Sequence, residues 1–225
     1  MTTQKYTPKQ LTDVIFPNSG VEARVNAYAN GRLGGNILLY GPNGTGKTSL
    51  ANLLPNLISG NGAYIETKSA DELMQVKGLE GYVRNAIAMS SIFGSDQYYW
   101  LFNEFDTASG NLAKLWNVMD KFTDYMRLII TTNDPMNVHK SIRSRCLEIH
   151  MPAITPAAML PRADLILKGE GLVLPYAQLL YYLKSREVYS DIRKYNQLLD
   201  DLILLHEAGK PMPAWSQSAT KIRVV

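Results

Sequence analysis

Residues 41–48 read Gly-Pro-Asn-Gly-Thr-Gly-Lys-Thr, and the expected fold follows from this segment and its neighbours. It matches the phosphate-binding pattern G-x-x-x-x-G-K-[ST]. Residues 37–40 before it form an apolar run that predicts a strand, and residues 49–54 after it predict a helix. The alternative is a glycine-rich turn that matches by chance, but such a turn needs neither the strand nor the helix. The sequence therefore predicts a binding site for a nucleoside triphosphate.

The spacing within this loop assigns a task to each part. The glycines let the backbone curl so that its N–H groups point at the β-phosphate, at the positive end of the following helix. Lys47 is placed to reach the β- and γ-phosphates, and the hydroxyl of Thr48 is placed to bind Mg²⁺. The candidate ATP-binding residues of the loop are Gly41, Pro42, Asn43, Gly44, Thr45, Gly46, Lys47, Thr48 and Ser49.

A polar pair follows a later apolar run. In ATPases with such a loop, a strand ends in an aspartate for Mg²⁺ and a glutamate for the attacking water. Here residues 98–102 are followed by Asn103 and Glu104, so the glutamate is present and asparagine replaces the aspartate. We expect Glu104 to polarise the water, Thr48 and Asn103 to bind the metal, and hydrolysis to be slow. The alternative is that Glu104 and Asp106 only cap a strand end.

The composition excludes several classes of protein. No apolar run in the 225 residues approaches the length of a membrane span, and the N-terminus lacks the apolar core of a signal peptide. Cys146 is the only cysteine, which excludes a disulfide framework and a cysteine zinc site. We therefore expect a cytoplasmic protein without a membrane partner. A net charge of +3 and a pI near 8.8 permit a polyanionic partner without arguing for one.

Strands and helices alternate up to residue 152, which predicts an α/β fold with a parallel sheet sandwiched by helices. A capping box at Ser69 begins helical sequence that breaks at Gly78 and resumes to about Phe93. An apolar stripe at helical spacing is expected in the core; it consists of Leu112, Leu115, Trp116, Met119 and Phe122. The expected strands occupy residues 37–40, 63–67, 98–102, 127–132 and 147–150.

The pattern changes beyond residue 152, where only helical segments are expected, around 156–168, 175–186 and 190–207. We therefore predict three regions. They are a nucleotide-binding α/β domain over 1–152, a small all-helical lid domain over 153–208, and a C-terminal tail over 209–225.

Four further motifs occur in a fixed order around the phosphate loop. They are Tyr-Thr-Pro-Lys-Gln-Leu-Thr-Asp-Val at 6–14, Thr-Thr-Asn at 131–133, Ser-Arg-Cys at 144–146 and Ser-Asp-Ile-Arg-Lys at 190–194. With this order and spacing the chain resembles an AAA+ ATPase of the clamp-loader class, the replication factor C and phage-type subunits that open sliding clamps. The resemblance covers nearly the whole chain.

The resemblance implies roles for particular residues. Tyr6, Pro8 and Val14 belong to the segment that wraps the adenine in that family. Asn133 corresponds to the sensor-1 residue beside the γ-phosphate, although a strand-end turn favoured by Asn-Asp-Pro is the alternative. Arg193 corresponds to sensor 2, the alternative being a solvated helix arginine.

Arg145 corresponds to the arginine that acts on ATP in the neighbouring subunit, so the resemblance implies a homo- or hetero-oligomer. With Lys47 and Glu104, these residues complete the expected catalytic set: Glu104, Lys47, Asn133, Arg145 and Arg193. Arg143, two residues earlier, is expected to be structural.

The family also implies DNA and a sliding clamp as partners. Helical sequence over 71–93 would offer Lys77 and Arg84 to DNA phosphates, unless this is an ordinary solvated helix face. Clamp-loader subunits carry a third, collar domain that this sequence does not contain. The alternative function is therefore a collarless AAA+ regulator or helicase-loader-like protein, whose ATP-dependent assembly recruits or remodels a protein partner.

Overall fold

The computed structural model describes residues 2–60, 62–105 and 113–215. Asp106, a possible strand cap, and Leu112, of the predicted apolar stripe, lie outside the described residues. The chain divides into two compact units. Unit 1 comprises Met1–Asn18, Asn43–Gly46 and Ala153–Val225, and unit 2 comprises Ser19–Pro42 and Lys47–Pro152. The predicted domain boundaries stay a prediction, and each unit is described by itself.

Unit 2 is built on a five-stranded sheet whose strand order is β2-β3-β4-β1-β5. Every neighbouring pair of strands is parallel, which confirms the predicted α/β architecture. The strands are β1 (Asn36–Tyr40), β2 (Tyr64–Lys68), β3 (Tyr98–Phe102), β4 (Met126–Thr132) and β5 (Cys146–His150).

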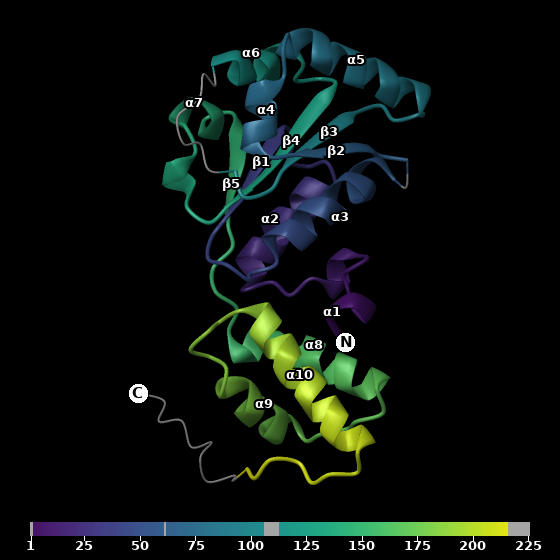
Figure 1. The fold of residues 1–225 in the computed structure, drawn as a ribbon, viewed down its shortest axis with the longest axis vertical. Coiled ribbons are helices and arrows are strands. Elements are labelled where there is room, and N and C mark those ends of the chain that lie inside the picture. Colours follow the sequence, from purple (N-terminus) through teal and green to yellow (C-terminus); the bar gives the residue numbers. More distant parts are fainter. Residues whose placement is uncertain (1, 61, 106–112, 216–225) are drawn as a thin grey trace. The chain divides into compact units, whose positions relative to one another are not determined.

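Helices cover both faces of this sheet (Figure 1). The three central strands β1, β3 and β4 are mostly apolar and buried, because their alternate side chains point to opposite, helix-covered faces of the sheet. On β3, Trp100 and Phe102 lie in the core shared with α4 (Ala70–Gln75), α5 (Leu79–Ile92) and α6 (Ala113–Lys121). The intervening Tyr99 is also fully buried, and its hydroxyl lies 2.5 Å from Ser59 Oγ at the end of α3 (Lys47–Ser59). The other helix on that face is α2 (Ser19–Ala29).

The cap of α4 and the break before α5 are those that the sequence predicts. The Ser69 hydroxyl accepts a hydrogen bond from Glu72 N, and the Glu72 carboxylate accepts one from Ser69 N, so α4 begins with a capping box. Gly78 has a φ of 65°, a left-handed conformation that suits glycine and separates α4 from α5. Leu115, Met119 and Phe122 of the predicted stripe are buried.

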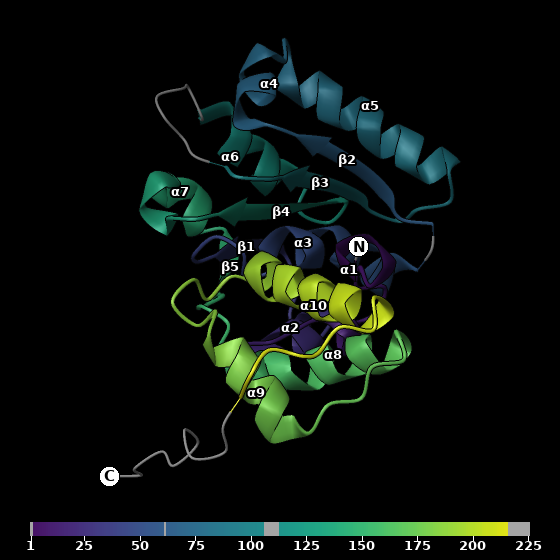
Figure 2. The same ribbon diagram turned by 60° about the horizontal axis from the view of Figure 1, so that its bottom comes forward.

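Unit 1 has its core between α8 (Pro156–Gly169), α9 (Tyr176–Lys184) and α10 (Ile192–Glu207), which lie side by side in Figures 1 and 2. It also contains α1 (Thr2–Lys5) and the 3-10 helix η1 (Leu11–Asp13). Arg162 of α8 joins this N-terminal segment to the core, because it binds Asp13 Oδ1 at 2.9 Å and the Tyr6 carbonyl at 3.0 Å.

None of the helices in the described ranges has the length and apolar character that a membrane crossing needs.

Candidate nucleotide-binding site

The phosphate loop begins where β1 ends. Gly41 has a φ of 143°, and a Cβ atom there would lie 2.1 Å from the Met151 carbonyl oxygen, so the position excludes any side chain. Gly44 and Gly46 have φ values of 72° and 85°, again in the region that favours glycine. The glycines of the predicted motif are therefore required by the backbone path. Helix α3 begins at Lys47, directly after the loop.

Lys47 points back into its own loop. Its ammonium donates to the carbonyl oxygens of Gly41 at 2.7 Å and Pro42 at 2.6 Å, and only 7% of the residue is exposed. A buried cation needs oxygen acceptors, and these carbonyls provide them. The phosphate oxygens of a bound nucleotide would be stronger acceptors because they are charged. The loop therefore fits the β- and γ-phosphates that the sequence predicts.

Asn103 and Glu104 follow β3 and are fixed by the end of β4. Glu104 N donates to Thr131 Oγ1 at 3.1 Å, and the Asn103 side-chain oxygen lies 3.5 Å from the same hydroxyl. Glu104 has a φ of 53°, a left-handed conformation that costs free energy for a residue with a side chain. Its side chain is exposed. Thr131 is buried, and the sequence named it only as part of the Thr-Thr-Asn motif, so its contact with Glu104 was not predicted.

The three neighbouring strands β3, β4 and β1 end at one edge of the sheet. Gly41 N donates to the Thr132 carbonyl at 3.3 Å, which ties the phosphate loop to the end of β4. The carboxyl edge of unit 2 therefore gathers the start of the loop, Lys47, Asn103, Glu104 and Asn133. Ligand sites of open α/β sheets lie at this edge.

The oxygen atoms at this edge fit a magnesium ion only in part. Thr48 is exposed and Asn103 is half-buried, so both side chains are accessible to a ligand. Both offer neutral oxygen atoms, whereas Mg²⁺ prefers carboxylates together with phosphate oxygens. In this donor set the phosphates would supply most of the negative charge that the metal needs.

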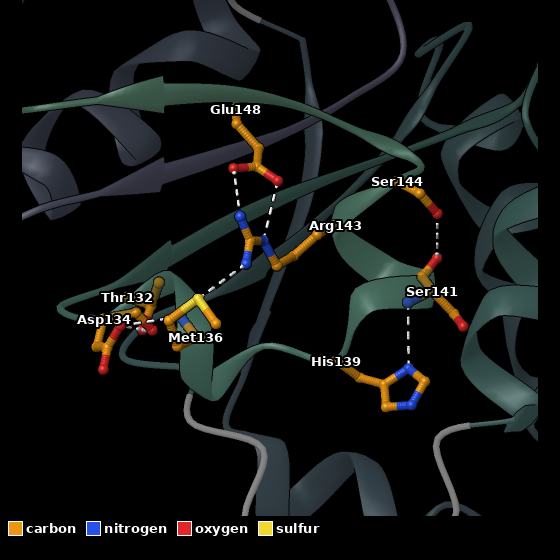
Figure 3. Close-up of polar contacts among 8 residues, drawn as sticks. All are labelled: Thr132, Asp134, Met136, His139, Ser141, Arg143, Ser144 and Glu148. Carbon is orange, nitrogen blue, oxygen red and sulfur yellow. Dashed lines mark hydrogen bonds and ion pairs between the residues drawn. The ribbon is translucent and has the colours of Figure 1, made fainter.

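Asn133 directly follows β4, and it is exposed. The adjacent Asp134 makes the turn: its carboxylate accepts from Met136 N at 2.9 Å, and its own N–H donates to Thr132 Oγ1 at 3.3 Å (Figure 3). The turn that the sequence offered as the alternative is therefore present, and it is capped by Asp134. The Asn133 amide is not one of its capping groups.

The two arginines before β5 have different partners. Arg143, at the end of α7 (Lys140–Arg143), makes a bidentate ion pair with Glu148 of β5, with both N–O distances 3.0 Å (Figure 3). Arg145 binds the Asp120 carboxylate of α6, also through two hydrogen bonds. Burial raises the pKa of the Cys146 thiol beside it to about 12, which disfavours the reactive thiolate.

Arg145 lies at the opposite edge of the sheet from the phosphate loop. It directly precedes β5, and its carbonyl accepts from the side chain of Asn36, the first residue of β1, at 3.2 Å. Since β1 and β5 are parallel, the full length of a strand separates Arg145 from Gly41 of the same chain. Arg145 therefore cannot reach the phosphates that Gly41 and Lys47 of the same chain would hold.

The remaining predicted residues belong to unit 1. The Tyr6 hydroxyl donates to Glu170 at 2.6 Å, and Pro8 and Val14 are half-buried. Arg193 is exposed on the first turn of α10 and pairs with Asp191 at 2.9 Å, the residue that caps this helix. The roles of these four residues toward adenine and the γ-phosphate stay predictions.

Residues 37–152 match the family described as "ATPase family associated with various cellular activities (AAA)". The match extends over more than half of the chain, and the chain therefore belongs to this family of ATPases.

Among curated proteins, the chain is 24% identical to human replication factor C subunit 5 over 171 residues, which are 74% of this chain and 50% of the human protein. It is 28% identical to the replication factor C large subunit of Methanococcoides burtonii over 181 residues, 76% of this chain and 35% of that subunit. The predicted resemblance to replication factor C subunits is confirmed. The chain spans about half the length of the first relatives or less.

Among solved structures, RuvB of Thermotoga maritima matches with a TM-score of 0.68 and 16% identity, covering 91% of this chain and 68% of RuvB. A DNA replication initiation factor matches with a TM-score of 0.61 and 18% identity, covering 89% and 65%. These likenesses confirm the fold.

Proposed function

We propose that this protein binds ATP with Mg²⁺, hydrolyses it slowly, and acts in DNA replication as a clamp-loader-like subunit of an oligomer. The observation that carries the proposal is the gathering of the start of the phosphate loop, Lys47 and Glu104 at the carboxyl edge of one sheet. Membership of an ATPase family and similarity to replication factor C subunits support the reaction and the process.

Each residue of the edge has a part in the proposed reaction. Backbone N–H groups of the loop and Lys47 hold the β- and γ-phosphates. Glu104, aimed outward by its left-handed backbone and by the hydrogen bond from its N–H to Thr131, accepts a proton from the attacking water. Asn133 donates an amide hydrogen bond to the γ-phosphate or orients the water. Mg²⁺, held by Thr48 and Asn103, would neutralise phosphate charge.

We further propose that Arg145 completes the site of a neighbouring subunit. Arg145 is separated from its own phosphate loop by the length of a strand, so a role in hydrolysis requires a second copy or a related subunit. A guanidinium that approaches the γ-phosphate from outside stabilises the charge of the transition state. The proposed oligomer follows from this placement.

The DNA part of the proposal concerns α5. Lys77 is exposed just before this helix, whereas Arg84 is paired with Glu80 at 3.1 Å on its exposed face. Because an exposed ion pair of this kind is weak, Arg84 can readily exchange its Glu80 partner for a DNA phosphate. The clamp and the partner subunits are proposed only through the relatives, whose full length exceeds that of this chain.

The central test is ATP binding by Lys47→Ala. We expect this variant to lose measurable affinity for ATP while its circular dichroism spectrum stays that of the wild type, because Lys47 brings the loop its fixed positive charge. Lys121→Ala, which removes an exposed lysine of the same unit, is the matched control and should bind ATP normally. Near-normal affinity in Lys47→Ala would overturn the site assignment.

A further inference from the structure

The guanidinium of Arg145 is held from two sides by groups of its own unit. Its Nε and Nη2 atoms each donate to a carboxylate oxygen of Asp120 at 2.6 Å, and Nη1 donates to the Ser141 carbonyl at 2.7 Å. Asp120 comes from α6 and Ser141 from α7. These contacts are short and charge-assisted, and the bidentate pair fixes the plane of the guanidinium.

The Ser141 carbonyl is itself fixed. His139 caps α7 by accepting from Ser141 N at 3.2 Å through Nδ1, and the Ser144 hydroxyl donates to the same Ser141 carbonyl at 3.2 Å (Figure 3). The His139 ring stacks on Trp116 of α6, with ring centroids 5.3 Å apart. Helices α6 and α7 are therefore joined to each other as well as to Arg145.

This arrangement leaves part of the guanidinium available. A guanidinium carries five N–H donors. The Asp120 and Ser141 contacts use one donor each on Nε, Nη1 and Nη2. Within the part of the chain that the structure describes, one donor on Nη1 and one on Nη2 have no protein partner. The Arg145 side chain is 31% exposed, so an external ligand has access to it.

We propose that Asp120 is a positioning residue, which together with the Ser141 carbonyl holds Arg145 as a fixed two-donor fork for the triphosphate bound to a neighbouring subunit. This inference rests on the proposed action of Arg145 in trans. An arginine side chain without these contacts would lose conformational freedom when the subunits associate. This entropic cost would reduce its net stabilisation of the transition state. With Asp120 in place, that ordering is complete before assembly.

A positioning role also accounts for the close pairing of Asp120 with Arg145, although the Asp120 side chain is exposed. The Arg145 hydrogen bonds hold the pKa of Asp120 below its ordinary value, so the pair is fully charged at neutral pH. An isolated surface pair of this kind contributes little to folding stability. Its geometry therefore matters more for where Arg145 points than for the stability of unit 2.

The test mixes two inactive chains. A chain with Glu104→Gln lacks the general base but keeps Arg145, and a chain with Arg145→Ala keeps an intact pocket. Mixing them should restore ATP hydrolysis at the mixed interface. Adding Asp120→Asn to the Glu104→Gln chain should then lower the restored rate by about tenfold or more, because misplacement of a catalytic group is costly. The KM for ATP should hardly change, since the pocket belongs to the other chain.

Two controls separate positioning from a general structural effect. Asp124→Asn removes an exposed aspartate just after α6 and should leave the restored rate unchanged. Asp120→Asn placed in the Arg145→Ala chain should have no larger effect than Asp124→Asn, because that chain has no arginine to position. If Asp120→Asn instead caused a structural defect, it would lower the restored rate whichever of the two chains carried it.

The outcomes distinguish this inference from the function on which it rests. If the two single variants restore no activity, the proposed action in trans fails. If they restore activity and Asp120→Asn in the Glu104→Gln chain leaves it unchanged, Asp120 does not position Arg145. A loss from both chains alike would also overturn the assignment.

Discussion

Asn103 and Glu104 are neighbours in the chain but face different surroundings. Asn103 is half-buried, with its side-chain oxygen toward Thr131, whereas Glu104 projects into solvent from a left-handed backbone. An aspartate at position 103 would bring a negative charge to the metal, and asparagine brings only a neutral oxygen. The rate of ATP hydrolysis should therefore depend on the residue at position 103.

We predict that Asn103→Asp raises steady-state ATP hydrolysis several-fold or more and lowers the Mg²⁺ concentration needed for half-maximal rate. Glu104→Gln should leave ATP bound and uncleaved, because it removes the base but not the phosphate contacts. The measurement is the ATPase rate across a Mg²⁺ titration. An unchanged or lower rate in Asn103→Asp would mean that another carboxylate already serves the metal and that added negative charge only crowds it.

Among the elements, the central strands could be predicted because β1, β3 and β4 are largely apolar runs, whereas the edge strands β2 and β5 carry charged residues and were expected from the alternation of strands and helices. The sequence also predicted the break at Gly78 and the cap at Ser69, which depend on local chemistry. The four-residue helices α1 and α7 were missed, since they are too short for a periodic pattern to show.

The site could be predicted only where its chemistry is local. The loop and its lysine follow one another in sequence, so their association needed no tertiary information. Asp120 and Arg145 are 25 positions apart and meet only when α6 packs beside the start of β5. On the sequence alone, Asp120 is an ordinary charged residue on the outer face of an amphipathic helix.

The N-terminal segment depends on Asp13, and this suggests a stability test. Burial alone would raise the pKa of Asp13, but hydrogen bonds from Lys9 N and the Arg162 guanidinium together lower it. Its contribution to stability is therefore present at neutral pH and is lost as the pH falls through this lowered pKa.

We predict that Asp13→Asn lowers the free energy of unfolding of unit 1 by about 1–3 kcal/mol at neutral pH, the usual effect of losing hydrogen bonds to a charged group. The difference from the wild type should shrink below about pH 4. Urea unfolding across this range provides the measurement. Lys5→Ala, which breaks an exposed pair with Glu170, is the control and should have no measurable effect. A loss that persists at low pH would exclude the charged pair as its cause.

Action of Arg145 on a neighbouring subunit requires that several chains assemble. We predict that gel filtration with ATP yields a discrete oligomer, and that duplex DNA stimulates its formation. Lys47→Ala, which should not bind ATP, serves as the control and should elute the same with and without ATP. A DNA-indifferent filament or a monomer would instead favour the collarless regulator.

The discontinuity of unit 1 has a consequence for synthesis on the ribosome. The ion pair between Asp13 and Arg162 and the hydrogen bond between Tyr6 and Glu170 join positions 149 and 164 residues apart. At common translation rates, about ten seconds or more separate the two ends of such a contact. Residues up to Pro152 complete unit 2 during this interval. The nascent segment that contains Tyr6 and Asp13 therefore lacks its native partners until α8 has left the exit tunnel.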